Sequence, residues 1–390
     1  FTVCHKIKGA TGTAILDEIH PLPYGNYPYL SFHTYTCEDE ESTLLFGYPY
    51  YQDGKWWIFK SIPNSEKIIT EGSIDNAVTV AMAMGCSTNA IIHLIAMARR
   101  AGINLTMDDL DKKGKKIPLI ANIRPSGKDY LMEDFYYAGG ILSLMCSLAS
   151  QLNLEEITVS GMKLGELIDG KETLNQDIIR PLDNPIYKEG SLAVLKGNLA
   201  PDGCVIKPAA CDKKFLKHKG PAIVFDSYPD MKKIIDSDEL DVTENHVLVL
   251  RNVGPVGGPG MPEWGMIPIP KKLLKKGVRD MVRISDARMS GTSYGACILH
   301  VAPESYIGGP LSLLKTGDIV EIDVNKRSIN MLVDDKTLQN RKSNLVQKKP
   351  KAGRGWLWMY SNHVKQANEG CDFDFLETDF GNSAKEPDIF

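Results

Sequence analysis

A ten-residue segment from Gly254 to Glu263 is the strongest candidate for a chemical site. It contains four glycines and three prolines and directly follows a short apolar run. Glycines permit unusual backbone conformations and close approach to a neighbour. A carboxylate at the end of such a loop can bind a hard cation or a sugar hydroxyl. A surface loop with a solvated Glu263 accounts for the pattern equally well.

A second candidate segment, Arg283–Gly295, combines hydroxyl side chains with two arginines at the expected end of a strand. Guanidinium groups match carboxylates and hydroxyls can relay protons, so the segment suits a polyhydroxylated anionic substrate. Alternatively, Ser290 or Thr292 caps a helix, and spacing alone slightly favours that interpretation. His93 and His300 lie in apolar runs and are expected to be satisfied core residues.

The first half of the chain is predicted to form helices. The apolar run Asn89–Ala98 predicts a buried helix that ends near Gly102. Another helix is expected after Thr106, because acidic residues would fill its first turn. Further helical patterns cover residues 140–152 and 164–168.

Short β-type runs follow a break in the pattern around Pro181–Gly190. They predict a barrel-like or sandwiched β domain with a few helices. The segment Gly197–Lys207 predicts a hairpin with its turn at Pro201–Gly203. The expected strands are Ser191–Leu195, Cys204–Lys207, Ala222–Phe225, His246–Leu250, Met281–Ile284 and Ile319–Val324.

The composition excludes several classes of protein. With 45 Lys and Arg against 49 Asp and Glu, the formal charge of −4 lacks the basic excess that nucleic-acid binding needs. No apolar run approaches the roughly 18 residues of a membrane span. The eight cysteines are scattered and form no Cys-x-x-Cys pair, which favours a reducing compartment. We therefore expect a soluble cytoplasmic protein that binds neither nucleic acid nor membrane.

Five segments recur in a recognisable order: GCSTNAIIHLIAMARRAGI, GSLAVLKGNLAPDGCVIK, GPAIVFDS, VLVLRNVGPVGGPGMPEW and RISDARMSGTSYGACILHVAPESYIGGPL. Together they closely resemble the dihydroxy-acid and sugar-acid dehydratase family, from about Ile69 to the end of the chain. The segments ARMSGTSYG, GNLAPDG and HVKQANEGCDFDFL resemble its aldonate branch, which dehydrates xylonate, arabinonate or related acids.

The resemblance implies an α/β fold: a remnant of an N-terminal α/β domain, then a C-terminal β-barrel-like swivelling domain with a few helices. It implies an active site that uses a 2Fe-2S cluster and Mg²⁺ to convert a 2,3-dihydroxy sugar acid to a 2-keto-3-deoxy acid. The family's magnesium glutamate falls on Glu263 and its proposed serine base on Ser290. Arg288 and Thr292 are expected to bind the substrate. We expect Glu263 and Ser290 to share one cleft, in a homodimer or homotetramer.

The chain departs from the family at its N-terminal end. The family's Asn-Cys-Asp-Lys and Cys-Gly motifs are absent, and Cys86 stands where the family usually has glycine. The cluster ligands are therefore expected to be missing, as in a truncated chain or a degenerate paralogue. The expected domains are an unmatched segment 1–65, an α/β part 66–184, a barrel 185–340 and a tail 341–390. A branched-chain dihydroxy-acid dehydratase and an inactive fragment serving as a binding or assembly module remain alternatives.

Overall fold

The computed structural model describes residues 50–52, 55–57, 65–291, 293–346, 348–349 and 352–376. The chain divides into two compact units. The smaller unit takes in the described residues up to Ser73 together with Asn153–Leu167, and the larger comprises Ile74–Leu152 and Ile168 onward. Most of the expected segment 1–65 lies outside the described residues.

The smaller unit contains a short antiparallel pair, β1 (Tyr50–Gln52) and β2 (Lys55–Trp57), and the helix α1 (Ser65–Ile68). Thr70 donates its hydroxyl to the carboxylate of Glu156 within this unit. The larger unit contains all the candidate site residues that the structure describes.

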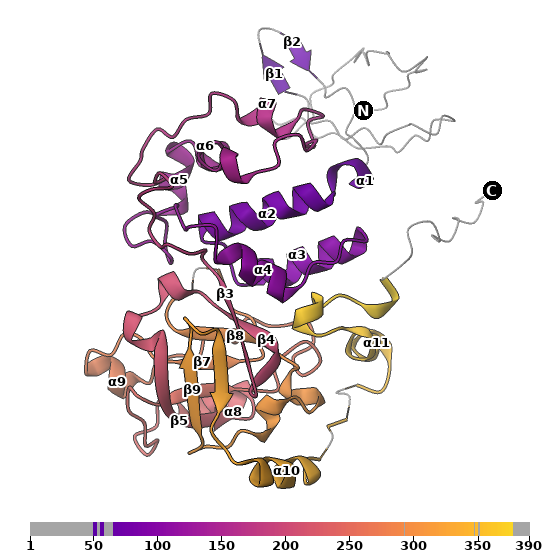
Figure 1. Ribbon diagram of the computed structural model, residues 1–390. Coiled ribbons are helices and arrows are strands. Elements are labelled where there is room, and N and C mark those ends of the chain that lie inside the picture. Colours follow the sequence, from indigo (N-terminus) through magenta and orange to yellow (C-terminus); the bar gives the residue numbers. More distant parts are fainter. Residues whose placement is uncertain are drawn as a thin grey trace, which may run out of the picture. The chain divides into compact units, whose positions relative to one another are not determined.

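Helices occupy the first part of the larger unit, as the sequence predicts (Figure 1). The expected helix Asn89–Ala98 is α3, and Gly102 follows it with a φ of +73°. Thr106 caps α4 through a capping box, so the predicted start of that helix is confirmed. The helices are α2 (Glu71–Met84), whose first residues belong to the smaller unit, α3 (Asn89–Arg100), α4 (Met107–Gly114), α5 (Met132–Tyr137), α6 (Gly140–Ser147) and η1 (Ala149–Gln151). The expected helix at 164–168 is α7 (Leu164–Ile168), and all but its last residue belong to the smaller unit.

A closed eight-stranded barrel follows, which confirms the predicted barrel-like domain. Its strand order is β10-β3-β4-β8-β7-β6-β5-β9. Residues such as Leu195, Val249 and Ile298 are almost fully buried and pack together inside it. The strands are β3 (Ala193–Gly197), β4 (Ala200–Ile206), β5 (Lys217–Phe225), β6 (Val247–Leu250), β7 (Arg283–Ser285), β8 (Cys297–Ala302), β9 (Ile319–Asp323) and β10 (Ser328–Met331).

Four neighbouring strands, β5 to β8, are parallel to one another. Their carboxyl ends therefore reach the same rim of the barrel. The connections between them carry the helices α8 (Tyr228–Ile234) and α9 (Lys271–Lys275). Short 3-10 turns complete the barrel: η2 (Pro208–Ala210), η3 (Lys213–Phe215), η4 (Ser305–Ile307) and η5 (Pro310–Leu313).

Two local expectations are wrong. Ser290 does not begin a helix, because the chain beyond it enters strand β8. The hairpin turn lies at Asn198–Leu199, between β3 and β4, and not at Pro201–Gly203. The latter residues form part of β4, where Gly203 has a φ of +107° and the register with β8 shifts. The glycine therefore serves an irregularity of the strand.

The described part of the tail packs back on the rest of the larger unit. It contains α10 (Asp335–Ser343), α11 (Gly355–His363), η6 (Ala367–Glu369) and η7 (Asp374–Leu376). Asp372 accepts two 2.6 Å hydrogen bonds from the guanidinium of Arg100, on α3. Across the part of the chain that the structure describes, no helix is both long and apolar enough to cross a bilayer.

Candidate active site

The candidate site lies on the barrel rim formed by the carboxyl ends of the parallel strands. The glycine-rich segment begins four residues after β6 ends at Leu250, and the Arg288–Ser290 segment follows β7. Because β6 and β7 are paired in parallel, both segments leave the barrel at the same edge. Parallel strands commonly present functional loops in this way.

Glu263 makes its described contacts with two side chains. Asn89, the first residue of α3, donates Nδ2 to Glu263 Oε1 at 3.2 Å. Arg288 Nη2 lies 3.5 Å from the same oxygen. The side chain of Glu263 is 45% exposed and that of Arg288 is 24% exposed, so this pair remains open to solvent.

Asn89 joins the two candidate segments. Its Nδ2 also donates to the carbonyl of Met289 at 3.0 Å. Both partners are acceptors, so the orientation of the amide is determined by its contacts. Asn89 Oδ1 is buried and has no hydrogen-bond partner among the described residues. This oxygen lies on the group that touches Glu263, so it is available to a ligand or cation there.

Ser290 belongs to the same short segment as Arg288 and Met289, next to the carbonyl that Asn89 binds. The carbonyl of Ser290 accepts from Ser293 N at 3.1 Å, which closes a turn. Thr292, the other predicted substrate contact, lies outside the described residues. Glu263 and the segment carrying Ser290 thus meet at one asparagine, while the role of the serine hydroxyl stays a prediction.

A fully buried lysine, Lys207, lies under this segment. Its Nζ is 3.3 Å from the carbonyl of Gly85 and 3.5 Å from that of Gly291. Burial lowers the pKa of this ammonium group, because desolvation disfavours its charge. Lys207 thus connects the Ser290 segment to the turn before α3.

His93 and His300 lie near Arg288 and both have a lowered pKa. Burial followed by the charges of Arg288 and His93 lowers the pKa of His300 to about 3. The same two causes, burial and then Arg288, lower the pKa of His93. His300 is fully buried, has a φ of +56°, and has no partner for either ring nitrogen within the described residues. The expectation that His300 is a buried residue holds, but not that its hydrogen bonds are satisfied. For His93 the expectation of a core residue is wrong, because it lies on an exposed position of α3.

A buried acid, Asp286, hydrogen-bonds the backbone just before the glycine-rich segment. Its carboxylate accepts from the backbone amides of Asn252 and Val253 at 3.2 and 3.1 Å, and from the amide and hydroxyl of Ser305 at 2.9 and 2.8 Å. Burial raises its pKa, while these hydrogen bonds oppose that shift. Sequence reasoning did not single out Asp286, although an acid just after an expected strand could have indicated it.

Glu263 fits one part of a magnesium site. Mg²⁺ is commonly held by one or two carboxylates and keeps several waters, and Glu263 offers an exposed carboxylate beside the unpartnered Asn89 Oδ1. Among the described residues, no three His, Cys, Asp or Glu side chains converge as a metal site. Glu263 is therefore a single carboxylate that would hold such a cation, and the described residues bring no second acid to it.

The described cysteines do not fit an iron–sulfur cluster. Cys86, Cys204 and Cys297 are buried on separate elements. Burial raises the pKa of Cys86 and of Cys297 to about 11, whereas cluster ligation needs thiolates that converge. Cys4 and Cys37 lie outside the described residues.

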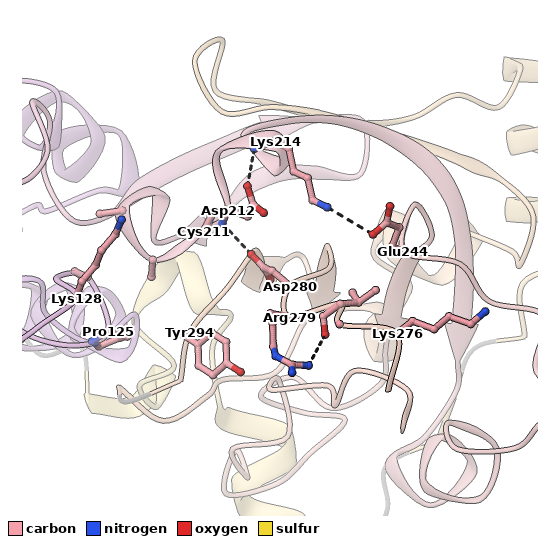
Figure 2. A pocket seen from close by; sticks show the side chains of 15 residues that line it. Pro125, Lys128, Cys211, Asp212, Lys214, Glu244, Lys276, Arg279, Asp280 and Tyr294 are labelled. Atoms are coloured by element: carbon pink, nitrogen blue, oxygen red, sulfur yellow. Dashed lines mark hydrogen bonds and ion pairs between the residues drawn. The ribbon is translucent and has the colours of Figure 1, made fainter. Parts of the chain in front are cut away.

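A separate pocket of about 470 Å³ lies beside η3 and the segment after α9. Figure 2 shows Lys214 paired with Glu244, at 3.7 Å, and the backbone amide of Asp212 directed at Asp280. Asp280 also pairs with the buried Arg283 at 3.0 Å. The acids that line this pocket therefore already have partners within the protein. Glu263, Arg288 and Ser290 are not among its lining residues.

Comparison with known proteins shows what the chain is similar to. Residues 57–167 match the dihydroxy-acid/6-phosphogluconate dehydratase N-terminal model and residues 177–371 match the C-terminal one. The chain is 50% identical over 324 residues to a 6-deoxy-6-sulfo-D-gluconate dehydratase of Pseudomonas putida, covering 82% of this chain and 55% of that protein. It is 43% identical over 319 residues to an L-arabinonate dehydratase of Rhizobium leguminosarum bv. trifolii, covering 81% and 55%.

A dihydroxy-acid dehydratase of Clostridium beijerinckii is 41% identical over 310 residues, covering 79% of this chain and 55% of that protein. The chain thus spans about half the length of the curated relatives it matches.

Proposed function

Because the chain belongs to the dihydroxy-acid/6-phosphogluconate dehydratase family, we propose that it carries one part of the active site of a sugar-acid hydro-lyase. The members of this family are dehydratases. The proposed substrate is a 2,3-dihydroxy sugar acid and the product a 2-keto-3-deoxy acid. The observation that carries the proposal is the meeting of Glu263, Arg288 and the Met289 carbonyl around Asn89.

In this proposal the chain's own residues orient the substrate and move one proton. Arg288 pairs with the substrate carboxylate, because a guanidinium matches that group in shape and charge. Ser290 takes the proton from C2, which requires an ionised hydroxyl. The C3 hydroxide leaves and takes up that proton to become water, and the resulting enol becomes the 2-keto acid when C3 gains a proton and the C2 hydroxyl loses its own to solvent. Thr292 remains a predicted substrate contact.

Glu263 is the proposed ligand of Mg²⁺, with Asn89 holding its carboxylate in place. When bound, Mg²⁺ supplies positive charge that stabilises negative charge developing on substrate oxygens. No step is assigned to a 2Fe-2S cluster, because the described cysteines do not fit one.

Two observations favour a sugar acid over a branched-chain acid. The described side chains that contact Glu263 are the polar Asn89 and Arg288, which suit hydroxyl groups better than an isopropyl group. Relatives named for sugar acids are 50% and 43% identical, against 41% for a dihydroxy-acid dehydratase. The branched-chain reaction is therefore the second candidate within the same class.

A different role, as a binding or assembly module without turnover, is favoured by the buried and dispersed cysteines. It predicts that the chain folds but does not dehydrate aldonates. Binding and turnover must therefore be measured separately.

The test is a calorimetric titration of the full chain, in excess Mg²⁺, with L-arabinonate, D-gluconate and 2,3-dihydroxyisovalerate. We expect the sugar acids to bind more tightly. Arg288→Gln should weaken their binding by about tenfold or more, because it removes a charge-assisted contact to the carboxylate. Arg279→Gln is the matched control, since Arg279 is an exposed arginine that lines the separate pocket.

Tighter binding of 2,3-dihydroxyisovalerate would favour the branched-chain reaction. Equal losses from Arg288→Gln and Arg279→Gln would contradict the site. Absence of binding by every acid would favour the assembly module.

A further inference from the structure

A second buried carboxylate, Glu304, hydrogen-bonds the backbone of the glycine-rich segment. It lies just beyond β8 and is fully buried. Its Oε1 accepts from Val256 N at 2.7 Å and its Oε2 accepts from Gly257 N at 2.8 Å. Both oxygens are thus engaged with neighbouring backbone amides of the segment that ends at Glu263.

Gln366, in the C-terminal segment, completes this arrangement. Its Nε2 donates to Glu304 Oε1 at 2.9 Å, and its Oε1 accepts from Glu304 N at 2.8 Å. The two residues therefore exchange hydrogen bonds across 62 positions of the chain. Without Gln366, the Glu304 amide would lose its partner in a buried setting.

One glycine of the segment is required by Glu304. A Cβ on Gly254 would lie 2.8 Å from Glu304 Cβ and Oε2, so a side chain there would push the backbone away from the carboxylate. A Cβ on Gly257 would instead lie 2.6 Å from the carbonyl of Asn252. Glu304 thus accounts for the glycine at position 254, next to the two amides that the carboxylate accepts.

The far end of the segment is also held by the C-terminal residues. Met261 is buried in a small cluster with Ile92 of α3 and Ala367, next to Gln366. Gly370 lies so close to α3 that a Cβ there would be 2.7 Å from Ala96 N. The C-terminal segment therefore contacts both the start of the glycine-rich segment, through Glu304, and its end.

We propose that Glu304 and Gln366 are positioning residues that fix the glycine-rich segment and so place Glu263 beside Asn89 and Arg288. We call the hydrogen bonds of Glu304 to Val256 N, Gly257 N and Gln366 the clamp. The functional meaning of the placement of Glu263 rests on the proposed function, whereas the clamp itself rests on these contacts. The C-terminal segment is then a structural part of the site.

The charges around Glu304 support a clamp that relies on hydrogen bonds. Burial and then the charge of Asp286 raise the pKa of Glu304 to about 7. The other titratable or charged groups that interact with it are Tyr306, Tyr360 and Cys371, with Arg288 also acting on the latter two. No described cation forms an ion pair with Glu304, so the two backbone amides and Gln366 are its stabilising partners.

The test is backbone hydrogen–deuterium exchange of the full chain, read on peptides covering residues 252–263. Glu304→Gln replaces one acceptor oxygen with an NH₂ donor, so Val256 N or Gly257 N must lose its partner. At about pH 8, above the Glu304 pKa of about 7, exchange of these amides should rise by about tenfold, the effect of losing one hydrogen bond to a charged acceptor. Gln366→Leu removes both hydrogen bonds between Gln366 and Glu304 but leaves those from Val256 N and Gly257 N, so it should raise exchange in the same peptides by a smaller factor.

Asp318→Asn is the matched control. Asp318 is another largely buried barrel carboxylate that accepts from a backbone amide, Lys315 N at 2.7 Å, and from Arg341. It does not touch the glycine-rich segment, so its variant should leave exchange of residues 252–263 unchanged.

Unchanged exchange at Val256 and Gly257 in Glu304→Gln would overturn the clamp. So would a uniform rise that includes β5 and β6, because this would indicate a loss of global stability only. The result does not depend on sugar-acid binding. A clamp that loosens in a chain unable to bind any sugar acid would refute the proposed function and leave the clamp standing.

Discussion

Replacement of Arg327 by methionine should separate the barrel from the helices that precede it. Arg327 lies in the turn between β9 and β10. Its Nε donates to Asp111 Oδ1 at 2.8 Å, its Nη1 donates to the carbonyl of Val324 at 2.7 Å, and its Nη2 pairs with Glu189. Asp111 belongs to α4, so one guanidinium joins the barrel to the helical part of the same unit.

The magnitude follows from the exposure of the partners. The side chains of Arg327 and Asp111 are each 11% exposed, whereas that of Glu189 is 39% exposed. Removing one partner of a buried pair costs roughly 3 to 5 kcal/mol. Asp111 keeps two other partners, Lys115 Nζ and Val194 N, which places the loss near the lower limit. The exposed Glu189 contact adds less than about 1 kcal/mol. We therefore expect a loss of about 3 kcal/mol.

The assay is denaturant unfolding followed by far-ultraviolet circular dichroism, with Arg341→Met as the control. Arg341 pairs with Asp318 at similar burial, 15% and 13% exposed, but contacts no helix before the barrel. Arg327→Met should split the unfolding transition so that helix is lost first, whereas Arg341→Met should shift a single transition. A loss below about 1 kcal/mol, or identical behaviour of both variants, would refute this reasoning.

Three further predictions concern the buried Glu304, the buried cysteines and the iron–sulfur cluster. The pKa of Glu304 rises from 4.5 to about 7 on folding, so the folded state binds more protons than the unfolded state between these pH values. The free energy of unfolding should therefore fall by about 3 kcal/mol as pH rises through this window. Denaturant titrations at a series of pH values measure this slope, and Glu304→Gln should flatten it. Because burial raises the pKa of Cys86 and Cys297 to about 11, both thiols should resist iodoacetamide in the native chain and react after denaturation. Mass spectrometry detects the labelling, and rapid labelling of the native chain would contradict their burial. The chain supplied anaerobically with iron and sulfide should show no stoichiometric cluster absorbance and no aldonate dehydration; a full cluster together with 2-keto acid from xylonate or arabinonate would mean that cysteines interpreted as structural are ligands.

Local patterns in the sequence predicted several of the elements, but not the helices α2 and α5 or the strands β8 and β10. The helix at Asn89, the capped start at Thr106 and the barrel domain all follow from periodicity and turn residues, which act over a few positions. Strand β8 was missed because its apolar run carries His300 and follows a segment that resembled a helix cap. The structure shows a strand there because β4 and β7 pair with it on either side.

The contacts of the candidate site were beyond such reasoning. Asn89 was predicted as the first residue of a buried helix, yet its amide binds Glu263, 174 positions away. Glu304 and Gln366 carried no local signal, because their partners are backbone amides and a residue in the tail. Burial of an acid is set by the whole fold, so its hydrogen bonds cannot be derived from neighbouring residues alone.

The closure of the barrel has a consequence for the order in which the protein can fold. The sheet closes where β10 pairs with β3, at Ser328 and Lys196, and contacts so distant in sequence, about 130 residues apart, slow folding. During synthesis, β3 must wait until residue 328 has left the ribosome, and β6 to β8 emerge in the interval with apolar surfaces uncovered. Such intermediates are prone to aggregation. Arg327, next to the closing pair, reaches Asp111 and Glu189 only when closure occurs, so its ion pairs to the helical part should form in the same late event as completion of the barrel.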